Sequence, residues 1–211
     1  PVAGTTGIAH TRWATHGPPS ERNAHPHVSG DRLAVVHNGI IENHAALRDR
    51  LEDEGYAFTS QTDSETVAHP IDLHFRTARS LADAVRLAVR ELDGAFAIAV
   101  VHRDAPDRLV AARRGSPLVV GVGIGEHYVA SDVLALRPVT DRFVFLEEGD
   151  LVEVTRDGLS MFDLENLAVV RATVRVEMAE EDTEKGPYRH HMLKEVFQQP
   201  QVIDATLDGQ I

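Results

Sequence analysis

The 211-residue sequence contains no cysteine. This absence excludes disulfide bonds, cysteine-ligated zinc sites and thiol catalysis by the residues present. Positive charge is also scarce, because 21 lysines and arginines stand against 33 aspartates and glutamates, for a formal net charge of −12. A protein that binds a phosphate backbone needs a basic patch, so we expect no nucleic-acid partner.

Long hydrophobic runs are missing as well. The sequence has no apolar stretch near the roughly 20 residues that a membrane helix requires, and its opening, PVAGTTGIAH, has no basic leader. We therefore expect no membrane partner and a cytoplasmic location. A hydrophobic fraction of 43% and a charged fraction of 26% are ordinary for a globular chain, and the length suits one main domain with a short appendage.

The first half of the sequence predicts a strand followed by helices. Residues 32–41, RLAVVHNGII, read as a buried strand that runs into a tight turn at Asn38 and Gly39. The next segment, 43–55, has the spacing of a helix with Asn43 as its N-cap.

Two further helices are predicted before residue 93. Ser64 is placed to cap a helix from about Glu65, in which Pro70 predicts a kink or a break because proline lacks the N–H that the preceding turn needs. Residues 80–92 have a helical apolar stripe, and Ser80 begins a capping box.

The second half is rich in predicted strands, which indicates two sheets packed together with helices outside, an α+β fold. The predicted strand segments are AFAIAVVH, RLVAARRG, PLVVGVG, HYVASD, RFVFLEEGDLVEVT and AVVRATVRVE. Residues 177–187 are acidic and end in Gly-Pro, which is typical of a linker, so we place the main domain at 1–176. Beyond the linker, Met192, Val196 and Phe197 have helical spacing.

Arg12 and Asp63 have the chemistry that a free amino acid requires. A guanidinium can hold a carboxylate through two parallel hydrogen bonds, and a carboxylate can accept from an ammonium group. Each residue also has an ordinary alternative, Arg12 as a surface cation and Asp63 as a turn or capping residue.

Asn38 and Gly39 follow the predicted strand directly. A strand end leaves backbone groups unpaired, and glycine lets a ligand approach its N–H closely. The Asn38 amide and the Gly39 N–H are therefore candidates for binding an oxyanion. The alternative is a hairpin turn, for which Asn-Gly is a strong signal.

Histidines are concentrated near the start of the chain, but they do not have the spacing of a metal motif. Glycines around residue 121 likewise lack the pattern of a nucleotide-binding loop. We therefore expect no metal and no cofactor. The six early histidines are His10, His16, His25, His27, His37 and His44.

Four motifs in order, HTRWATHG, NAHPH, VVHNGIIENH and TDSETVAH, resemble the N-terminal-nucleophile (Ntn) hydrolase domain of class II glutamine amidotransferases. Further motifs, above all KGPYRHHMLKEVFQQP, resemble the branch of this family that aminates a sugar phosphate. The resemblance implies a four-layer αββα sandwich. It also implies that residues 177–211 are the linker and the start of a sugar-isomerase domain.

The resemblance assigns roles to individual residues. It implies that Arg12 holds the α-carboxylate of L-glutamine, that Thr15 and His16 line the same pocket, and that Asp63 pairs with the α-ammonium. Trp13 matches the residue that helps close the path of ammonia. Asn38 and Gly39, by the same resemblance, match the oxyanion hole.

The implied reaction is hydrolysis of glutamine through a thioester, with ammonia passed to fructose 6-phosphate to give glucosamine 6-phosphate. In the family, the nucleophile is an N-terminal cysteine whose own amino group is the base. The resemblance also implies a homo-oligomer for the full-length protein.

This sequence departs from that pattern, because it begins with Pro1 and lacks both the Cys-Gly-Ile start and the Tyr-Arg-Gly-Tyr-Asp motif. We expect an N-terminally truncated domain that is inactive as it stands. The alternatives are a non-catalytic glutamine-binding module, catalysis by the Pro1 amine, the amidophosphoribosyltransferase branch of the family, and a histidine-rich metal-binding protein.

Overall fold

The computed structural model describes residues 4–13, 15–177 and 185–209. The chain separates into two compact units, Pro1–Arg175 and Val176–Ile211. Most of the predicted acidic linker, 178–184, lies outside the described residues. Within the described segments, none of the helices is long and apolar enough to cross a membrane.

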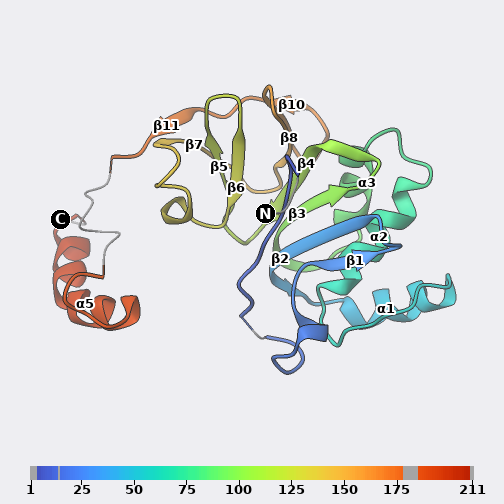
Figure 1. Cartoon of the computed structure of the whole chain (residues 1–211), viewed down its shortest axis with the longest axis horizontal. Helices are drawn as coiled ribbons and strands as arrows, with labels where there is room; N and C mark the ends of the chain where they lie inside the picture. Colours follow the sequence, from blue (N-terminus) through green and yellow to red (C-terminus); the bar gives the residue numbers. More distant parts are fainter. Residues whose placement is uncertain (1–3, 14, 178–184, 210–211) are drawn as a thin grey trace. The chain divides into compact units, whose positions relative to one another are not determined.

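The first unit contains a seven-stranded antiparallel sheet in the order β1-β2-β3-β4-β8-β9-β10 (Figure 1). Its strands are β1 (His27–Ser29), β2 (Leu33–Ile41), β3 (Gly94–His102), β4 (Ala105–Arg114), β8 (Leu151–Thr155), β9 (Leu159–Phe162) and β10 (Ala168–Val169). A second, four-stranded antiparallel sheet has the order β11-β7-β5-β6. Its strands are β5 (Val119–Val122), β6 (His127–Ala130), β7 (Arg142–Phe145) and β11 (Thr173–Arg175).

Strand β3 shows why the two sheets pack face to face. Phe96 and Ile98 point into the core shared with the helices, whereas Ala97 and Ala99 belong to the core shared with the smaller sheet. Successive side chains of a strand point to opposite faces. A strand with an unbroken apolar run, here 95–101, must therefore be covered on both sides, as its sequence predicted.

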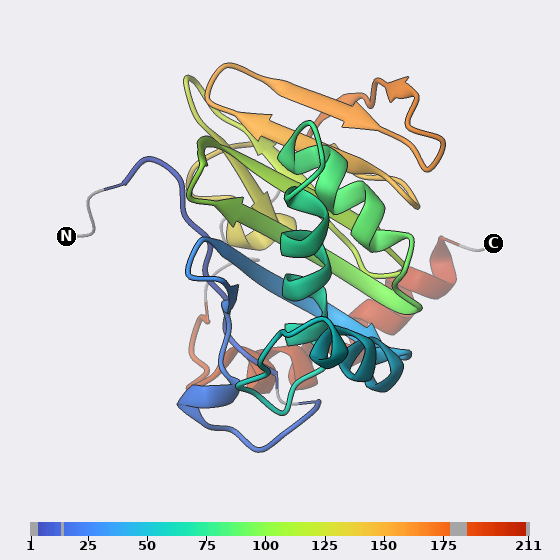
Figure 2. The ribbon, with the colours of Figure 1, turned by 90° about the vertical axis from the view of Figure 1, so that its right-hand side faces the viewer.

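Three helices cover the other face of the larger sheet (Figure 2). They are α1 (His44–Asp53), α2 (Glu65–Phe75) and α3 (Leu81–Val89). Leu47 and Leu51 of α1 are buried in the core between the helices and this sheet, and the apolar stripe of α3 is buried in the same core. The Ser80 hydroxyl accepts from the Asp83 N–H, which confirms the predicted cap of α3.

The outer face of the smaller sheet is covered at Gly121, which lies in β5. A Cβ added there would lie 2.9 Å from Leu136 and from Thr140, which follow the short 3-10 helix η2 (Val133–Ala135). The α+β class and the sandwich of two sheets are thus confirmed. In the described part of the chain, this turn and the residues after it cover the outer face at this point.

The predicted turn at Asn38 and Gly39 is wrong, because β2 continues through both residues to Ile41. Asn38 pairs with Ala97 and Gly39 pairs with Phe96. Gly39 has a φ of 126°, and a Cβ there would lie 2.0 Å from the Ala95 carbonyl oxygen. The glycine therefore serves close strand pairing rather than a hairpin.

Two other local predictions need correction. Of the two outcomes predicted at Pro70, the break is wrong and the kink stays a prediction: helix α2 continues to Phe75, because its residues from Glu65 to Asp72 are buried and packing outweighs the lost hydrogen bond. Asn43 and Ser64 do precede helices, but neither side chain makes a capping hydrogen bond.

The second unit contains helix α5 (His191–Asp208), which confirms the helical spacing seen in the sequence. Met192, Val196 and Phe197 are exposed on it. The ring of Phe197 stacks on Tyr188, with 5.5 Å between the ring centroids.

Replacing Gly94 with alanine should destabilise the first unit. Gly94 has a φ of 110°, and a Cβ there would lie 2.2 Å from the Ile40 carbonyl oxygen. We expect Gly94→Ala to lower the free energy of unfolding by roughly 3 kcal/mol, measured by urea denaturation. Gly158→Ala is the control, since a Cβ there meets no atom within 4 Å. Equal stability of the two variants would contradict the close approach of β2 and β3.

Candidate functional site

A pocket of about 450 Å³ lies where the N-terminal segment, the end of β2 and the loop before α2 meet. Every residue that the sequence predicted for the site lines it. These residues are Arg12, Trp13, Thr15, His16, Asn38, Gly39 and Asp63. Segments far apart in the sequence therefore build one cavity.

Asp63 is held rigidly at the pocket wall. Its side chain is buried, and its Oδ2 accepts a hydrogen bond of 2.8 Å from the Ile41 N–H. The other oxygen, Oδ1, lies 3.4 Å from Nδ1 of His16. The end of β2 thus orients the carboxylate, and His16 brings the N-terminal segment into contact with it.

Arg12 is engaged with its own loop. Its guanidinium donates to the carbonyl oxygens of His16, Gly17 and Pro18. These contacts occupy three of the five N–H groups that a guanidinium carries. A ligand carboxylate would have to exchange with at least one of these carbonyls to be held by both terminal nitrogens.

Trp13 and Thr15 lie at the rim of the pocket. The Trp13 side chain is 85% exposed, and Thr15 is exposed as well. A large apolar ring left in water beside a polar pocket is a surface that a bound ligand or a neighbouring segment would cover.

Asn38 and Gly39 enter the pocket from β2. The Asn38 Oδ1 accepts a hydrogen bond of 2.6 Å from the His10 Nε2. Because both residues belong to a paired strand, their backbone is fixed before any ligand binds.

The sequence did not single out several residues of the pocket as ligand contacts. The Ser64 hydroxyl pairs with Nδ1 of His37 at 2.9 Å instead of capping α2. The rings of His10 and His25 lie 4.2 Å apart between centroids. The crowding of histidines in the first 44 residues was the available signal, and it indicates a packed cluster.

Burial determines the charge of two of these histidines. It lowers the pKa of His37 to about 4. It also lowers the pKa of His25 to about 3, with a further contribution from His10. Both rings are therefore neutral near pH 7. In the described part of the chain, no three histidine, aspartate or glutamate side chains are grouped as metal ligands.

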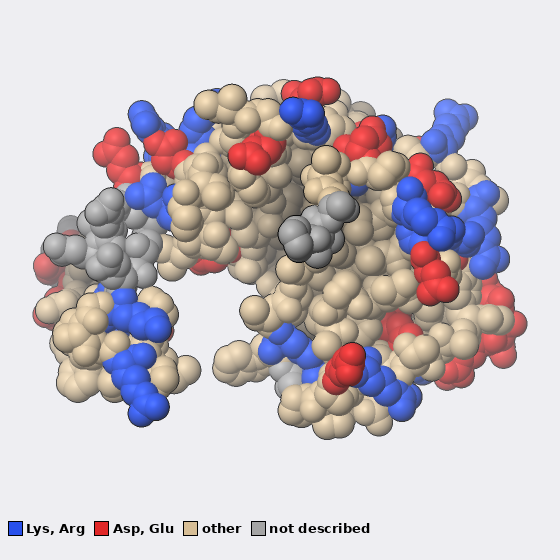
Figure 3. All heavy atoms as spheres, in the orientation of Figure 1, with Lys and Arg blue, Asp and Glu red and all other residues tan. Residues whose placement is uncertain are grey.

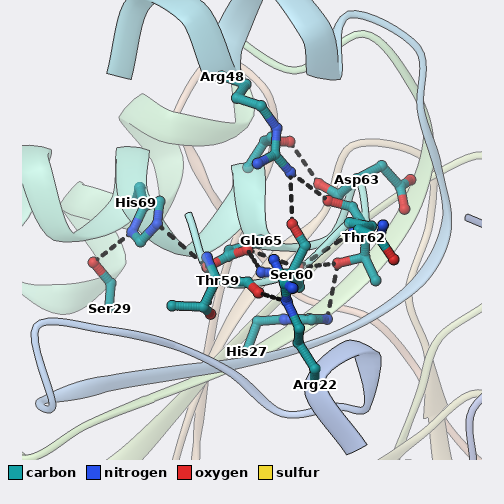
Figure 4. A network of polar contacts seen from close by, with 12 residues as sticks. Arg22, His27, Ser29, Arg48, Thr59, Ser60, Thr62, Asp63, Glu65 and His69 are labelled. Carbon is teal, nitrogen blue, oxygen red and sulfur yellow. Dashed lines mark hydrogen bonds and ion pairs between the residues drawn. The ribbon is translucent and has the colours of Figure 1, made fainter. Parts of the chain in front are cut away.

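Glu65 organises the loop that presents Asp63 (Figure 4). Its buried carboxylate accepts from the N–H and the hydroxyl of Thr59, at 2.8 and 3.0 Å, and from those of Ser60, both at 2.7 Å. Arg48 donates to the carbonyls of Ser60 and Thr62 from the other side. Burial alone would raise the pKa of Glu65, but the hydrogen bonds from Ser60 and Thr59 outweigh it and lower the pKa.

Charged side chains of both signs lie beside one another on the face shown in Figure 3. Independently of this view, the described residues include the ion pairs Arg50–Glu91 and Arg108–Glu153. Such pairs at the surface contribute little to stability.

The chain matches a family described as the glutamine amidotransferase domain over residues 10–138, a range that contains the whole pocket. It is 55% identical over 211 residues to glutamine–fructose-6-phosphate aminotransferase (isomerizing) of Pseudomonas syringae pv. tomato, covering all of this chain and 34% of that protein. The protein of the same name from Vibrio cholerae is 54% identical over 210 residues, again with 34% of that protein covered. The chain thus spans about a third of the length of these relatives.

Among solved structures, the chain is similar to glutamine phosphoribosylpyrophosphate amidotransferase from B. subtilis. The two are 26% identical with a TM-score of 0.61, and the match covers 74% of this chain and 34% of that chain. The structural similarity and the family match therefore both point to an amidotransferase.

Replacing Glu65 should loosen the loop before Asp63. Glu65→Gln removes the charge that strengthens four hydrogen bonds and puts an NH₂ group against N–H donors. We expect the free energy of unfolding to fall by about 2–4 kcal/mol in urea denaturation. Glu52→Gln, on the exposed side of α1, should change it by less than about 0.5 kcal/mol. Similar values for the two variants would rule out this role of Glu65.

Stability should fall as the pH decreases from 6.5 toward 4. In this range the unfolded chain protonates histidines with the ordinary pKa of 6.5, whereas folded His37 and His25 stay neutral. The contribution of these two rings to the free energy of unfolding is complete above pH 6.5. Below that pH it decreases by up to about 1.4 kcal/mol per pH unit for each ring. Urea denaturation at about pH 7, 6 and 5 measures the slope. His37→Gln should make it shallower, and a flat profile for the unmodified chain would contradict the neutral cluster.

Proposed function

The chain belongs to the glutamine amidotransferase family, and we propose that its pocket binds L-glutamine and stabilises the oxyanion formed when the side-chain amide is hydrolysed. The observation that carries this proposal is the meeting of Arg12, Asp63 and the Asn38–Gly39 pair in one cavity. A free amino acid with a side-chain amide has the three complementary groups.

In the proposed complex, Arg12 holds the α-carboxylate and Asp63 accepts from the α-ammonium. Thr15 and His16 line the space between them. The side chain of glutamine then extends toward Asn38, where the amide NH₂ and the Gly39 N–H face its carbonyl oxygen. The buried position of Asp63 supports this pose, since a fixed carboxylate in a water-poor site binds an ammonium more strongly than an exposed one does.

The proposed reaction gives glutamate and ammonia. In the family the attacking group is a cysteine thiolate, and this chain has no cysteine. We therefore propose that the chain alone binds glutamine without cleaving it. A second candidate is a glutamine-binding module with no catalytic role, for which Arg12 and Asp63 in one cavity would suffice.

The proposed acceptor of the ammonia is fructose 6-phosphate. This proposal rests on the names of the relatives that are 55% and 54% identical to the chain. The solved phosphoribosylpyrophosphate amidotransferase is only 26% identical. The higher identity of the other relatives favours fructose 6-phosphate over phosphoribosylpyrophosphate as the acceptor. The acceptor would bind in another domain, with Trp13 bordering the path of ammonia, and the complete protein would form a homo-oligomer.

Calorimetric titration of the chain with L-glutamine tests the proposed pose. Arg12→Lys keeps the charge but loses the planar fork, and Asp63→Asn keeps an acceptor for the Ile41 N–H but loses the charge. We expect the Kd to rise by about tenfold or more in each variant, since a hydrogen bond to a charged group contributes about 1.5–3 kcal/mol. Arg156→Lys, at an exposed position, is the matched control.

Two analogues divide the test by functional group. Glutaramate lacks the α-ammonium, so its binding should be weak and insensitive to Asp63→Asn. 4-Aminobutyramide lacks the carboxylate, so its binding should be insensitive to Arg12→Lys. Absence of L-glutamine binding by the unmodified chain would overturn the proposed function.

A further inference from the structure

The Asn38 side chain has two ends with opposite chemistry. Its Oδ1 accepts from the His10 Nε2 at 2.6 Å. Its NH₂ group makes no hydrogen bond to the described residues, and the residue lines the pocket. Only the NH₂ end can donate to an oxyanion, whereas the oxygen end would repel one. The function of Asn38 therefore depends on which end faces the pocket.

The contact with His10 determines this orientation. A neutral imidazole has one N–H and one bare nitrogen. With the proton on Nε2, the ring donates to Oδ1 and the NH₂ group turns toward the pocket. With the proton on Nδ1, the bare Nε2 would accept from the Asn38 NH₂, and Oδ1 would face the pocket instead.

Burial around His10 favours the first arrangement. Its Nδ1 is buried without a hydrogen-bond partner in the described structure. A proton on Nδ1 would therefore be a buried donor with no acceptor, and such donors are rarer in proteins than unpaired acceptors. The ring is held in place by His25, whose centroid lies 4.2 Å away.

The contacting histidine rings connect the two sides of the pocket. His25 contacts His27 at 4.8 Å between centroids, and the His27 Nε2 pairs with the Thr62 hydroxyl at 3.0 Å. Thr62 is bonded to Asp63 in sequence. The position of the His10 ring is therefore fixed relative to the groups that we assign to the substrate.

We propose that His10 is a positioning residue that donates from Nε2 to Asn38 and so directs the Asn38 NH₂ group toward the amide carbonyl of the ligand. This proposal rests on the proposed function, because it assumes that glutamine occupies the pocket. It concerns His10, which lines the same pocket but to which the proposed pose assigns no contact with the ligand.

Affinities for two ligands test the proposal on the chain as it is. L-Norleucine matches the length of L-glutamine but has no side-chain carbonyl for Asn38 to contact. We expect His10→Phe to raise the Kd for L-glutamine about five- to tenfold and to leave that for L-norleucine unchanged. If His10 had a merely structural role, His10→Phe would raise the Kd for both ligands equally, and that result would overturn the proposal.

A matched pair of variants tests whether a hydrogen-bond donor is needed at the position of the His10 Nε2. The amide nitrogen of glutamine can occupy the position of the histidine Nε2, and that of asparagine cannot. His10→Gln should therefore keep the affinity for L-glutamine, while His10→Asn should lose it as His10→Phe does. In an Asn38→Ala background, His10→Phe should cause no further loss. An equal further loss there would show that His10 acts independently of Asn38.

The tautomer can be read directly from long-range ¹H–¹⁵N correlations of the histidine rings. We expect the His10 proton on Nε2, and a proton on Nδ1 would overturn the proposal even if a variant fails to fold. The two hypotheses fail separately. A chain that binds neither ligand refutes the proposed function, whereas a chain that binds both but shows no selective effect of His10→Phe refutes the positioning role alone.

Discussion

The pairing of β2 with β3 is the constraint on which the pocket depends. Nine consecutive residue pairs join the two strands without a shift of register. This ladder carries Asn38 and Gly39 to the pocket and leaves the N–H of Ile41 to orient Asp63. The strands approach closely because Gly39 has no side chain to meet the neighbouring backbone. The chemistry of the site therefore depends on the packing and the register of these two strands. A slip of one residue would turn Asn38 to the opposite face of the sheet.

The two sides of the pocket differ in how they are held. On one side, Asp63 is supported by a paired strand and by the Glu65 network, in which the Glu65 carboxylate and its Ser60 donors are buried. On the other side, the segment with Arg12 and His16 has no regular secondary structure and is attached through the side-chain contacts of His10 with Asn38 and of His16 with Asp63. The anion of the site is thus more firmly placed than the cation. A ligand with both charges would join the two sides, so its binding should order the N-terminal segment more than the strand.

Local patterns in the sequence predicted the features that depend on short-range periodicity. The continuous apolar run of β3 indicated a strand covered on both faces, and Ser80 was correctly placed as a cap. The local predictions failed where contacts with residues distant in the sequence determine the structure. Ser64 has the sequence context of an N-cap, but His37 takes its hydroxyl. Asn-Gly is a turn signal in isolation, and pairing with β3 overrides it. Neither partner is close in sequence, so no local pattern could have shown these contacts.

Because the buried histidines are neutral, the polar pocket keeps the charges of Arg12 and Asp63 without further charge from these rings. Burial lowers the pKa of His25 and His37 far enough that both rings stay uncharged near pH 7. If they carried charge, they would repel Arg12 and compete with a ligand ammonium for Asp63. As neutral rings they supply hydrogen bonds and packing without changing the balance of one cation and one anion. That balance is the one that a zwitterionic amino acid requires, so the same burial that holds the cluster together also preserves the charge complementarity of the site.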